Sequence, residues 1–202
     1  MRYSAEHKQE TRARIVDAAG RLFRQEGYGG SGIDGLTKAA GVTNGAFYGH
    51  FKSKSEAFRT AVVAGLEELR HGIVGLAAGR KKGWFKSFVA YYLGPKRTCE
   101  LGQSCALPSL SPDVMRADLE TRSAYERELR MVIRELASGL CETGASEPKI
   151  ARQEDTAIAL LALLSGGVTL ARAVPDPALS ERIARIVERT ADAIASSGPP
   201  GR

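Results

Sequence analysis

Two short amphipathic segments joined by a glycine turn constrain this chain more than any other feature. The first segment runs from Ile33 to Ala40, and the second lies in 41–51, Gly-Val-Thr-Asn-Gly-Ala-Phe-Tyr-Gly-His-Phe. Gly41 can adopt the left-handed backbone conformation that a sharp turn requires. Two short helices joined by such a turn form a helix-turn-helix unit, whose second helix fits the major groove of DNA. The pattern therefore favours a DNA-binding protein.

The composition is that of a globular protein. Of the 202 residues, 43% are hydrophobic and 26% are charged, which is enough to bury a sizeable core. No run of 18 uninterrupted apolar residues occurs and the first ten residues hold no apolar signal segment, so we expect no membrane span and a cytoplasmic location. The three cysteines form no C-x-x-C pair, which fits a reducing compartment.

Basic charge is concentrated toward the N-terminus. The net charge is +6, and residues 1–60 hold ten Lys and Arg against six Asp and Glu. Positive charge beside a helix-turn-helix would attract the phosphate backbone of DNA. Many soluble proteins carry such an excess, so the charge supports the motif without establishing it.

Helical spacing of apolar residues extends along nearly the whole chain, and no alternating strand pattern is convincing. We therefore expect an all-α protein of about nine helices. The predicted helices cover 11–26, 33–40, 43–49, 53–78, 84–93, 118–140, 151–174 and 179–195, with 95–117 irregular.

Polar residues before the apolar runs predict where helices begin. Thr43 is a good N-cap for the second helix of the unit, and Ser31 can cap the first. Ser53 and Glu56 form a capping box that opens the next, longer helix.

Together these features resemble the TetR family of transcriptional regulators, over about 11–58. The matching residues are Ile15-Val-Asp-Ala-Ala, Leu22-Phe23, Gly27-Tyr28, Ile33, Leu36, Ala40-Gly41-Val42-Thr43, Gly45, Phe47-Tyr48, His50-Phe51 and Ser53-Lys54. The resemblance implies a DNA-binding domain in 1–53 and an effector-binding and dimerisation domain in 54–195. The Gly- and Pro-containing tail in 196–202 is expected to be disordered. The resemblance also implies a homodimeric repressor of a pseudo-palindromic double-stranded DNA operator, released by a small, largely apolar effector, with no cofactor or metal and no membrane.

In the second helix of the unit, packing residues alternate with residues that can meet DNA. Phe47 anchors the helix in the core, whereas the resemblance implies that Tyr48, His50 and Lys54 contact phosphates, which suits hydroxyls and cations. Asn44 could pair bidentately with adenine. The expected DNA-binding set is Ser31, Thr43, Asn44, Gly45, Phe47, Tyr48, His50 and Lys54.

Three residues depart from the family pattern. Gly32 stands where a hydroxyl residue is usual, Asn44 replaces a frequent lysine, and Gly49 replaces a larger residue. We expect these changes to shift operator preference and to weaken the grip on phosphates, without affecting the fold.

The segment 84–93 carries five aromatic residues. Those spaced four apart are explained by core packing, but five exceed what one helical stripe needs, and apolar pockets with a few polar groups bind small molecules. By resemblance the effector cavity lies among the middle helices. Its expected lining is Trp84, Phe88, Tyr92, Cys105, Leu107, Tyr125, Leu129 and Val168.

Residues 158–164, Ile-Ala-Leu-Leu-Ala-Leu-Leu, are apolar on nearly all sides, which indicates burial on all sides. In a chain this small the pattern favours burial against a second subunit, with the last two helices forming a four-helix bundle across a two-fold axis. The expected interface is Leu160, Leu161, Leu164, Ile183, Ile186 and Val187.

Two alternatives stay open. One is a cysteine-based sensor of electrophiles or redox state with the same fold, for which Cys99 and Cys105 are the candidates. The other is a DNA-binding factor without an effector. An enzyme is not expected, because no Gly-rich phosphate loop, G-x-S-x-G or H-E-x-x-H pattern occurs.

Overall fold

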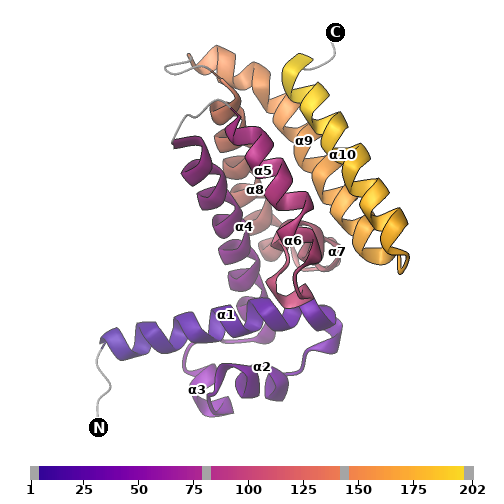
Figure 1. Ribbon diagram of the computed structural model, residues 1–202. Coiled ribbons are helices and arrows are strands. Elements are labelled where there is room, and N and C mark those ends of the chain that lie inside the picture. Colours follow the sequence, from indigo (N-terminus) through magenta and orange to yellow (C-terminus); the bar gives the residue numbers. More distant parts are fainter. Residues whose placement is uncertain (1–4, 79–82, 142–145, 198–202) are drawn as a thin grey trace. The chain divides into compact units, whose positions relative to one another are not determined.

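A computed structural model describes residues 5–78, 83–141 and 146–197. These ranges contain ten α-helices, one 3-10 helix and no strand (Figure 1), which confirms the all-α prediction. The elements are α1 (Ala5–Gly30), α2 (Ile33–Ala40), α3 (Asn44–Tyr48), α4 (Lys54–Ala78), α5 (Trp84–Leu93), α6 (Pro95–Thr98), η1 (Leu101–Gln103), α7 (Ala106–Val114), α8 (Leu119–Leu140), α9 (Glu147–Ala173) and α10 (Pro177–Ser197). Three of them, α6, η1 and α7, lie in 95–117, which was expected to be irregular.

The chain divides into two compact units. The first comprises Met1–Leu66 and Glu100–Glu126, and the second comprises Glu67–Cys99 and Arg127–Arg202. The division differs from the predicted boundary after residue 53, because the first half of α4 belongs with the N-terminal helices, together with η1, α7 and the start of α8. Of the predicted disordered tail, 198–202 lies outside the described residues.

The first unit is built around aromatic and small aliphatic side chains. On α1, Ile15, Ala18 and Phe23 recur at helical spacing, and none is more than 3% exposed. The other buried members of this core are Ala19, Leu36, Ala40, Phe47, Phe51, Ala57, Phe58, Ala61, Val62, Ala106, Leu110 and Val114. Gly27 interrupts α1 with a non-helical φ of 71°, close to the predicted end of this helix. A further helical turn then continues to Gly30.

Within the first unit, α4 and α7 cross at a glycine. A Cβ atom on Gly65 would lie 2.4 Å from the Cβ atom of Ala106, closer than two carbon atoms can approach. Gly65 therefore allows α7 to pack directly on α4. The Oδ2 atom of Asp113 near the end of α7 accepts a hydrogen bond of 2.9 Å from the backbone N–H of Tyr28, which ties α7 to the end of α1.

The second unit contains the paired helices α9 and α10, which lie side by side in Figure 1. They approach closely at Gly167, where a Cβ atom would lie 2.7 Å from a methyl group of Val187. The buried aromatic residues of α5 also belong to this unit. Trp84 at the start of α5 donates a hydrogen bond of 3.1 Å from Nε1 to the carbonyl of Gly139, which ties α5 to the end of α8.

Four of the six residues predicted to form a dimer interface are buried within the single chain. They are Leu160, Leu161, Leu164 and Val187, none more than 7% exposed. The packing of α9 on α5 and α10 accounts for this burial. These four side chains present no surface to a second copy, so this part of the prediction is wrong. Of the other two, Ile186 is 45% exposed and Ile183 is half-buried.

By length and composition alone, α9 is able to cross a membrane. The most apolar 18-residue window of its segment Pro148–Ala173 has a mean hydropathy of 1.6, although charged and polar residues interrupt the apolar run. Core helices of globular proteins share this property, and 44% of the most apolar window is buried within the protein. On the side of α9 away from the core, Ile158 is 49% and Leu170 is 62% exposed.

Candidate nucleic-acid interface

The turn between α2 and α3 is held by backbone hydrogen bonds and one side-chain cap. Gly41 ends α2 in the left-handed region, with φ 64° and ψ 39°, where a residue with a Cβ atom is strained. The N–H of Val42 donates to the carbonyl of Thr37 at 2.9 Å. Thr43 then caps α3, because its Oγ1 accepts a hydrogen bond of 3.1 Å from the N–H of Ala46. The predicted cap is confirmed.

The short helix α3 has a buried and an exposed face. Phe47 is 0% exposed and its ring centre lies 5.5 Å from that of Phe51. Phe47 therefore anchors the helix, and its inclusion among the residues that contact DNA is wrong. Tyr48 is 56% exposed. At Gly45 a Cβ atom would meet only Thr43, at 3.9 Å, so the surface there is open to a close partner.

The amide of Asn44 is already engaged by α2. Its Nδ2 donates to Oδ1 of Asp34, and its Oδ1 accepts from the hydroxyl of Thr37, both at 2.9 Å. A bidentate contact with adenine uses the same two atoms. The predicted adenine contact is therefore blocked in this conformation.

Two further predicted DNA contacts are used inside the protein. Ser31 is 0% exposed, and its hydroxyl donates to the carbonyl of Gly27 at 2.9 Å, so Ser31 neither contacts DNA nor caps α2. The N-cap of α2 is Gly32, which has no side chain to offer. The ammonium of Lys54 donates to the carbonyl of Tyr28 and lies 4.3 Å from the centre of its ring. A phosphate contact by Lys54 stays a prediction that requires the ammonium to leave this position.

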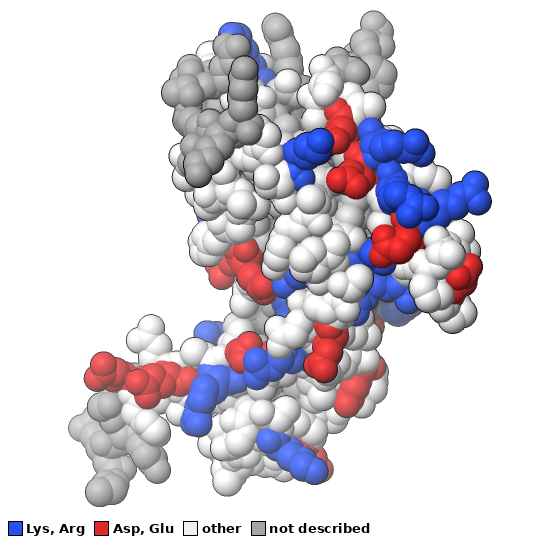
Figure 2. Space-filling model, in the orientation of Figure 1, with Lys and Arg blue, Asp and Glu red and all other residues white. Residues whose placement is uncertain are grey.

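A basic cluster that the sequence interpretation missed lies beside His50. Burial lowers the pKa of His50 below its ordinary 6.5, and the positive charges of Lys8 and Arg12 lower it further. Lys8 and Arg12 are exposed, four residues apart near the start of α1. In Figure 2 charged side chains lie along α1, whereas the surface over α2 and α3 is largely uncharged. The i, i+4 spacing of the two cations was the available signal, but the predicted helix began only at Thr11.

The residues predicted to line an effector cavity divide between the two units. In the second unit Phe88, Tyr92 and Val168 are buried, and Trp84 and Leu129 are half-buried. In the first unit Cys105 and Leu107 are buried, and Tyr125 is half-buried with its hydroxyl 2.8 Å from that of Ser111. The rings of Phe88 and Tyr92 lie 5.6 Å apart between centres. That all eight residues line one cavity stays a prediction.

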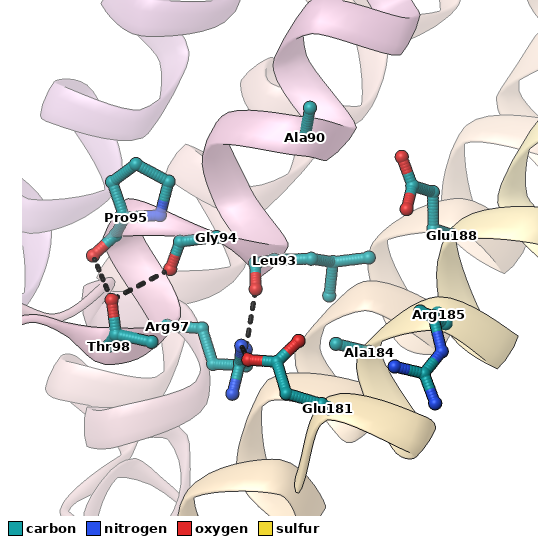
Figure 3. Close-up of a pocket in the computed structure, with 10 residues that line it drawn as sticks. All are labelled: Ala90, Leu93, Gly94, Pro95, Arg97, Thr98, Glu181, Ala184, Arg185 and Glu188. Carbon is teal, nitrogen blue, oxygen red and sulfur yellow. Dashed lines mark hydrogen bonds and ion pairs between the residues drawn. The ribbon is translucent and has the colours of Figure 1, made fainter. Parts of the chain in front are cut away.

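A groove of about 620 Å³ lies in the second unit between the end of α5, α6 and α10 (Figure 3). Its lining residues are Ala90, Leu93, Gly94, Pro95, Arg97, Thr98, Glu181, Ala184, Arg185 and Glu188, and none of them was predicted. Arg97 is only 7% exposed. Its guanidinium donates to the carbonyl of Leu93, to the hydroxyl of Ser180 at 2.7 Å and to the carboxylate of Glu181. These bonds fasten α6 to α10, so we assign Arg97 a structural role.

The two candidate sensor cysteines have different surroundings. Cys99 is half-buried and its Sγ donates to the carbonyl of Lys96 at 3.1 Å. Cys105 is 5% exposed and occupies the N-cap position of α7. It also lies near Tyr125, whose pKa is raised chiefly by burial, while the hydrogen bond with Ser111 opposes this rise and the neighbouring Cys105 adds to it.

An acidic residue inside the second unit was not singled out from the sequence. Glu128 on α8 is 6% exposed, and its Oε2 is buried without a hydrogen-bond partner among the described residues. A buried carboxylate without a partner is costly, and such groups call for a functional explanation. The available signal was the position of Glu128, four residues before Val132, where a carboxylate interrupts the apolar stripe of α8.

Comparisons with known proteins agree with this geometry. A family model described as bacterial regulatory proteins of the tetR family matches residues 15–60. The transcriptional regulator AcrR of Shigella flexneri is 49% identical over 57 residues, which is 28% of this chain and 26% of that protein. The transcriptional repressor NemR of Escherichia coli K12 is 30% identical over 150 residues, which is 69% of this chain and 75% of NemR.

Two solved structures share the fold. The crystal structure of E. coli NemR in its reduced form has a TM-score of 0.72 at 22% identity, covering 89% of this chain and 96% of that one. A TetR-family regulator from Agrobacterium tumefaciens has a TM-score of 0.69 at 21% identity, covering 90% and 98%. At these identities the likeness concerns the fold alone. In sequence, the chain matches about a quarter of the length of AcrR and of the Pseudomonas putida regulator TtgR.

Proposed function

Because this chain belongs to the TetR family of bacterial transcriptional regulators, we propose that it binds a pseudo-palindromic DNA operator as a homodimer and represses transcription until a small effector releases it. Regulators of this family bind operator DNA and effectors as dimers. In this proposal the protein works in the cytoplasm, where DNA and effector meet.

The exposed face of α3 is the observation that carries the proposal. A helix of five residues held by the Gly41 turn and by buried Phe47 presents Thr43 and Tyr48 to solvent. The basic cluster at the start of α1 supplies cations beside it. Phosphate contacts of this kind set the register of a helix in the major groove, and base contacts then give specificity.

Replacing Tyr48 with alanine tests the interface. We expect operator affinity to fall about tenfold to a hundredfold, because a hydrogen bond to a charged group contributes about 1.5–3 kcal/mol. Affinity is measured by electrophoretic mobility shift on duplexes that the wild-type protein selects from random sequence. The matched control is Tyr91→Ala, since Tyr91 is similarly exposed, at 51%, but lies on α5. Equal affinities of Tyr48→Ala and the wild type would remove Tyr48 from the interface, and failure of the wild type to enrich any sequence would refute operator binding.

The proposed dimer uses the outward faces of α9 and α10. Apolar residues on these helices are exposed in the single chain, among them Ile158, Leu170, Leu179 and Ile186. A second copy would cover them, and paired helices at a two-fold axis form a four-helix bundle. The buried residues Leu161 and Leu164 then hold α9 in its own subunit and contribute to the dimer only indirectly.

The proposed effector site lies inside the second unit, close to Glu128. The unpartnered carboxylate supports an effector that is largely apolar but carries a cationic or hydrogen-bond-donating group. Phe88 and Tyr92 of the same unit supply apolar surface of the predicted kind.

We expect apolar amines to raise the melting temperature of the protein more than their neutral isosteres do, and Glu128→Gln to abolish this difference. The same variant should melt at a higher temperature without ligand, because it removes a buried carboxylate whose Oε2 atom lacks a partner among the described residues. Thermal-shift measurements with Glu135→Gln, a change on the same helix, provide the control. If amines and isosteres stabilise the variant and the wild type alike, Glu128 has no part in binding.

A thiol sensor is the second candidate function, favoured by the position of Cys105 at the start of α7 beside Tyr125. The same thermal-shift panel separates it from the first when it includes N-ethylmaleimide. A response to this reagent alone, lost in Cys105→Ser, would favour the thiol sensor over a reversible effector. No response to any compound would favour a factor without an effector.

A further inference from the structure

The side chains of Asp34, Thr37 and Asn44 form a closed network on the surface of the helix-turn-helix. Asn44 Nδ2 donates to Asp34 Oδ1 at 2.9 Å, and Thr37 Oγ1 donates to Asn44 Oδ1 at 2.9 Å. Thr37 is 4% exposed, and its hydroxyl also lies 3.2 Å from the backbone carbonyl of Asp34. The network joins the first helix of the motif to the first residue of the second.

The network defines which end of the amide faces which partner. A carboxylate only accepts hydrogen bonds, so the nitrogen of Asn44 must face Asp34, and the oxygen is left for the hydroxyl of Thr37. Asp34 and Thr37 are three residues apart and therefore lie on one face of α2. They engage Oδ1 and Nδ2 of the amide, the two atoms that act together in a bidentate contact.

Adenine is recognised by asparagine through that same edge, with the oxygen accepting from N6 and the nitrogen donating to N7. A switch of Asn44 to adenine would break both bonds of the network and leave the carboxylate of Asp34 without its donor, close to the negative charge of DNA. What Asn44 can offer while the network persists is its second amide hydrogen, a single donor. In the major groove a single donor is met by N7 or O6 of guanine, by N7 of adenine or by O4 of thymine, whereas cytosine presents the N4 donor.

We propose that Asp34 and Thr37 are positioning residues that restrict Asn44 to donating one hydrogen bond in each half-site, which disfavours cytosine and prevents the bidentate contact that would select adenine over guanine and thymine. The proposal rests on operator binding by α3 and deepens it. It also explains the effect of having Asn44 where lysine is frequent in the family. Asn44 is an uncharged donor, and Asp34 and Thr37 on α2 set the direction in which it donates.

The experiment is selection of duplexes from random sequence by the wild-type protein and by Asn44→Ala, Asp34→Ala and Asp17→Ala. We expect the wild type to disfavour cytosine at one position of each half-site without selecting adenine over guanine and thymine, and Asn44→Ala to lose that preference. Asp34→Ala frees Nδ2 of the amide, and the hydroxyl of Thr37 can still donate to the backbone carbonyl of residue 34 instead of to Asn44, so the preference at that position should move to adenine by tenfold or more. Asp17→Ala also removes a carboxylate from the head, but one paired with Arg21 on α1, and should leave the base preference unchanged.

A merely structural role of the network would lower affinity for all sequences and leave the preferred base unchanged, which overturns the proposal. Selection of adenine over guanine and thymine by the wild type, at the position that Asn44→Ala alters, also overturns it. If the wild-type protein enriches no sequence at all, operator binding itself fails. If it enriches an operator in which Asn44→Ala changes no position, only the inference about Asn44 fails.

Discussion

Glutamate substitutions at Leu170 and Ile186 together are expected to convert the proposed dimer into monomers. Both side chains are largely exposed in the single chain, at 62% and 45%, so the fold of each subunit does not depend on them. Gly167 of α9 meets Val187 of α10, which places Leu170 and Ile186 at about the same level of the paired helices. Two carboxylates buried against a second copy without partners would cost more than the interface gains.

The loss of the dimer should remove nearly all operator binding. A dimer binds two half-sites at once, and the loss of such bivalency lowers affinity by about 10²–10⁴-fold. Multi-angle light scattering measures the mass, fluorescence anisotropy measures operator binding, and circular dichroism checks that helicity is kept. Met115→Glu provides the control, because Met115 is a 70% exposed apolar residue outside α9 and α10. A dimer mass for the double variant would refute the proposed interface.

Replacing Phe47 with alanine is expected to unfold the DNA-binding head. Phe47 is 0% exposed and packs on the rings of Tyr48 and Phe51 at 5.4 and 5.5 Å between centres. Truncation of a buried phenylalanine costs about 3–5 kcal/mol, a large part of the stability of a small domain. Operator binding should therefore disappear, although Phe47 itself touches no DNA.

The dimer should survive this change, because α9 and α10 belong to the other compact unit. Urea unfolding followed by circular dichroism gives the stability, and light scattering gives the mass. Phe47→Leu keeps most of the buried volume and should retain measurable operator affinity. Wild-type stability and affinity of Phe47→Ala would contradict the assignment of Phe47 as the anchor of α3.

Local sequence signals predicted the helix-turn-helix well. The bounds of α2 and α5 agree with the prediction, because glycines lie directly at both ends of each helix. Residues 95–117 were misjudged for a physical reason: prolines and glycines there indicate breaks, yet α7 accommodates Pro112 near its C-terminal end. Long-range packing, such as that of α7 on α4, determines whether such segments are helical. This packing cannot be recognised from the hydrophobic periodicity of the segments themselves.

The site was predicted less well, because side-chain partners distant in sequence decide it. Asn44 was expected to contact DNA, because the sequence does not show that the carboxylate of Asp34, ten residues earlier, accepts a hydrogen bond from its amide. Ser31 was expected to cap α2, but its hydroxyl donates a hydrogen bond to the carbonyl of Gly27 instead. The apolar stretch of α9 correctly indicated burial all round, yet periodicity does not distinguish burial in the same chain from burial against a partner.

The crossing of α4 and α7 at Gly65 has an evolutionary consequence. Because a Cβ atom at position 65 would overlap that of Ala106, the two sites cannot vary independently. An alanine at 65 is tolerable only alongside a glycine at 106, and either change alone leaves an overlap or a gap. In descendants of this protein residues 65 and 106 should therefore change together, although they are more than 40 residues apart in the sequence.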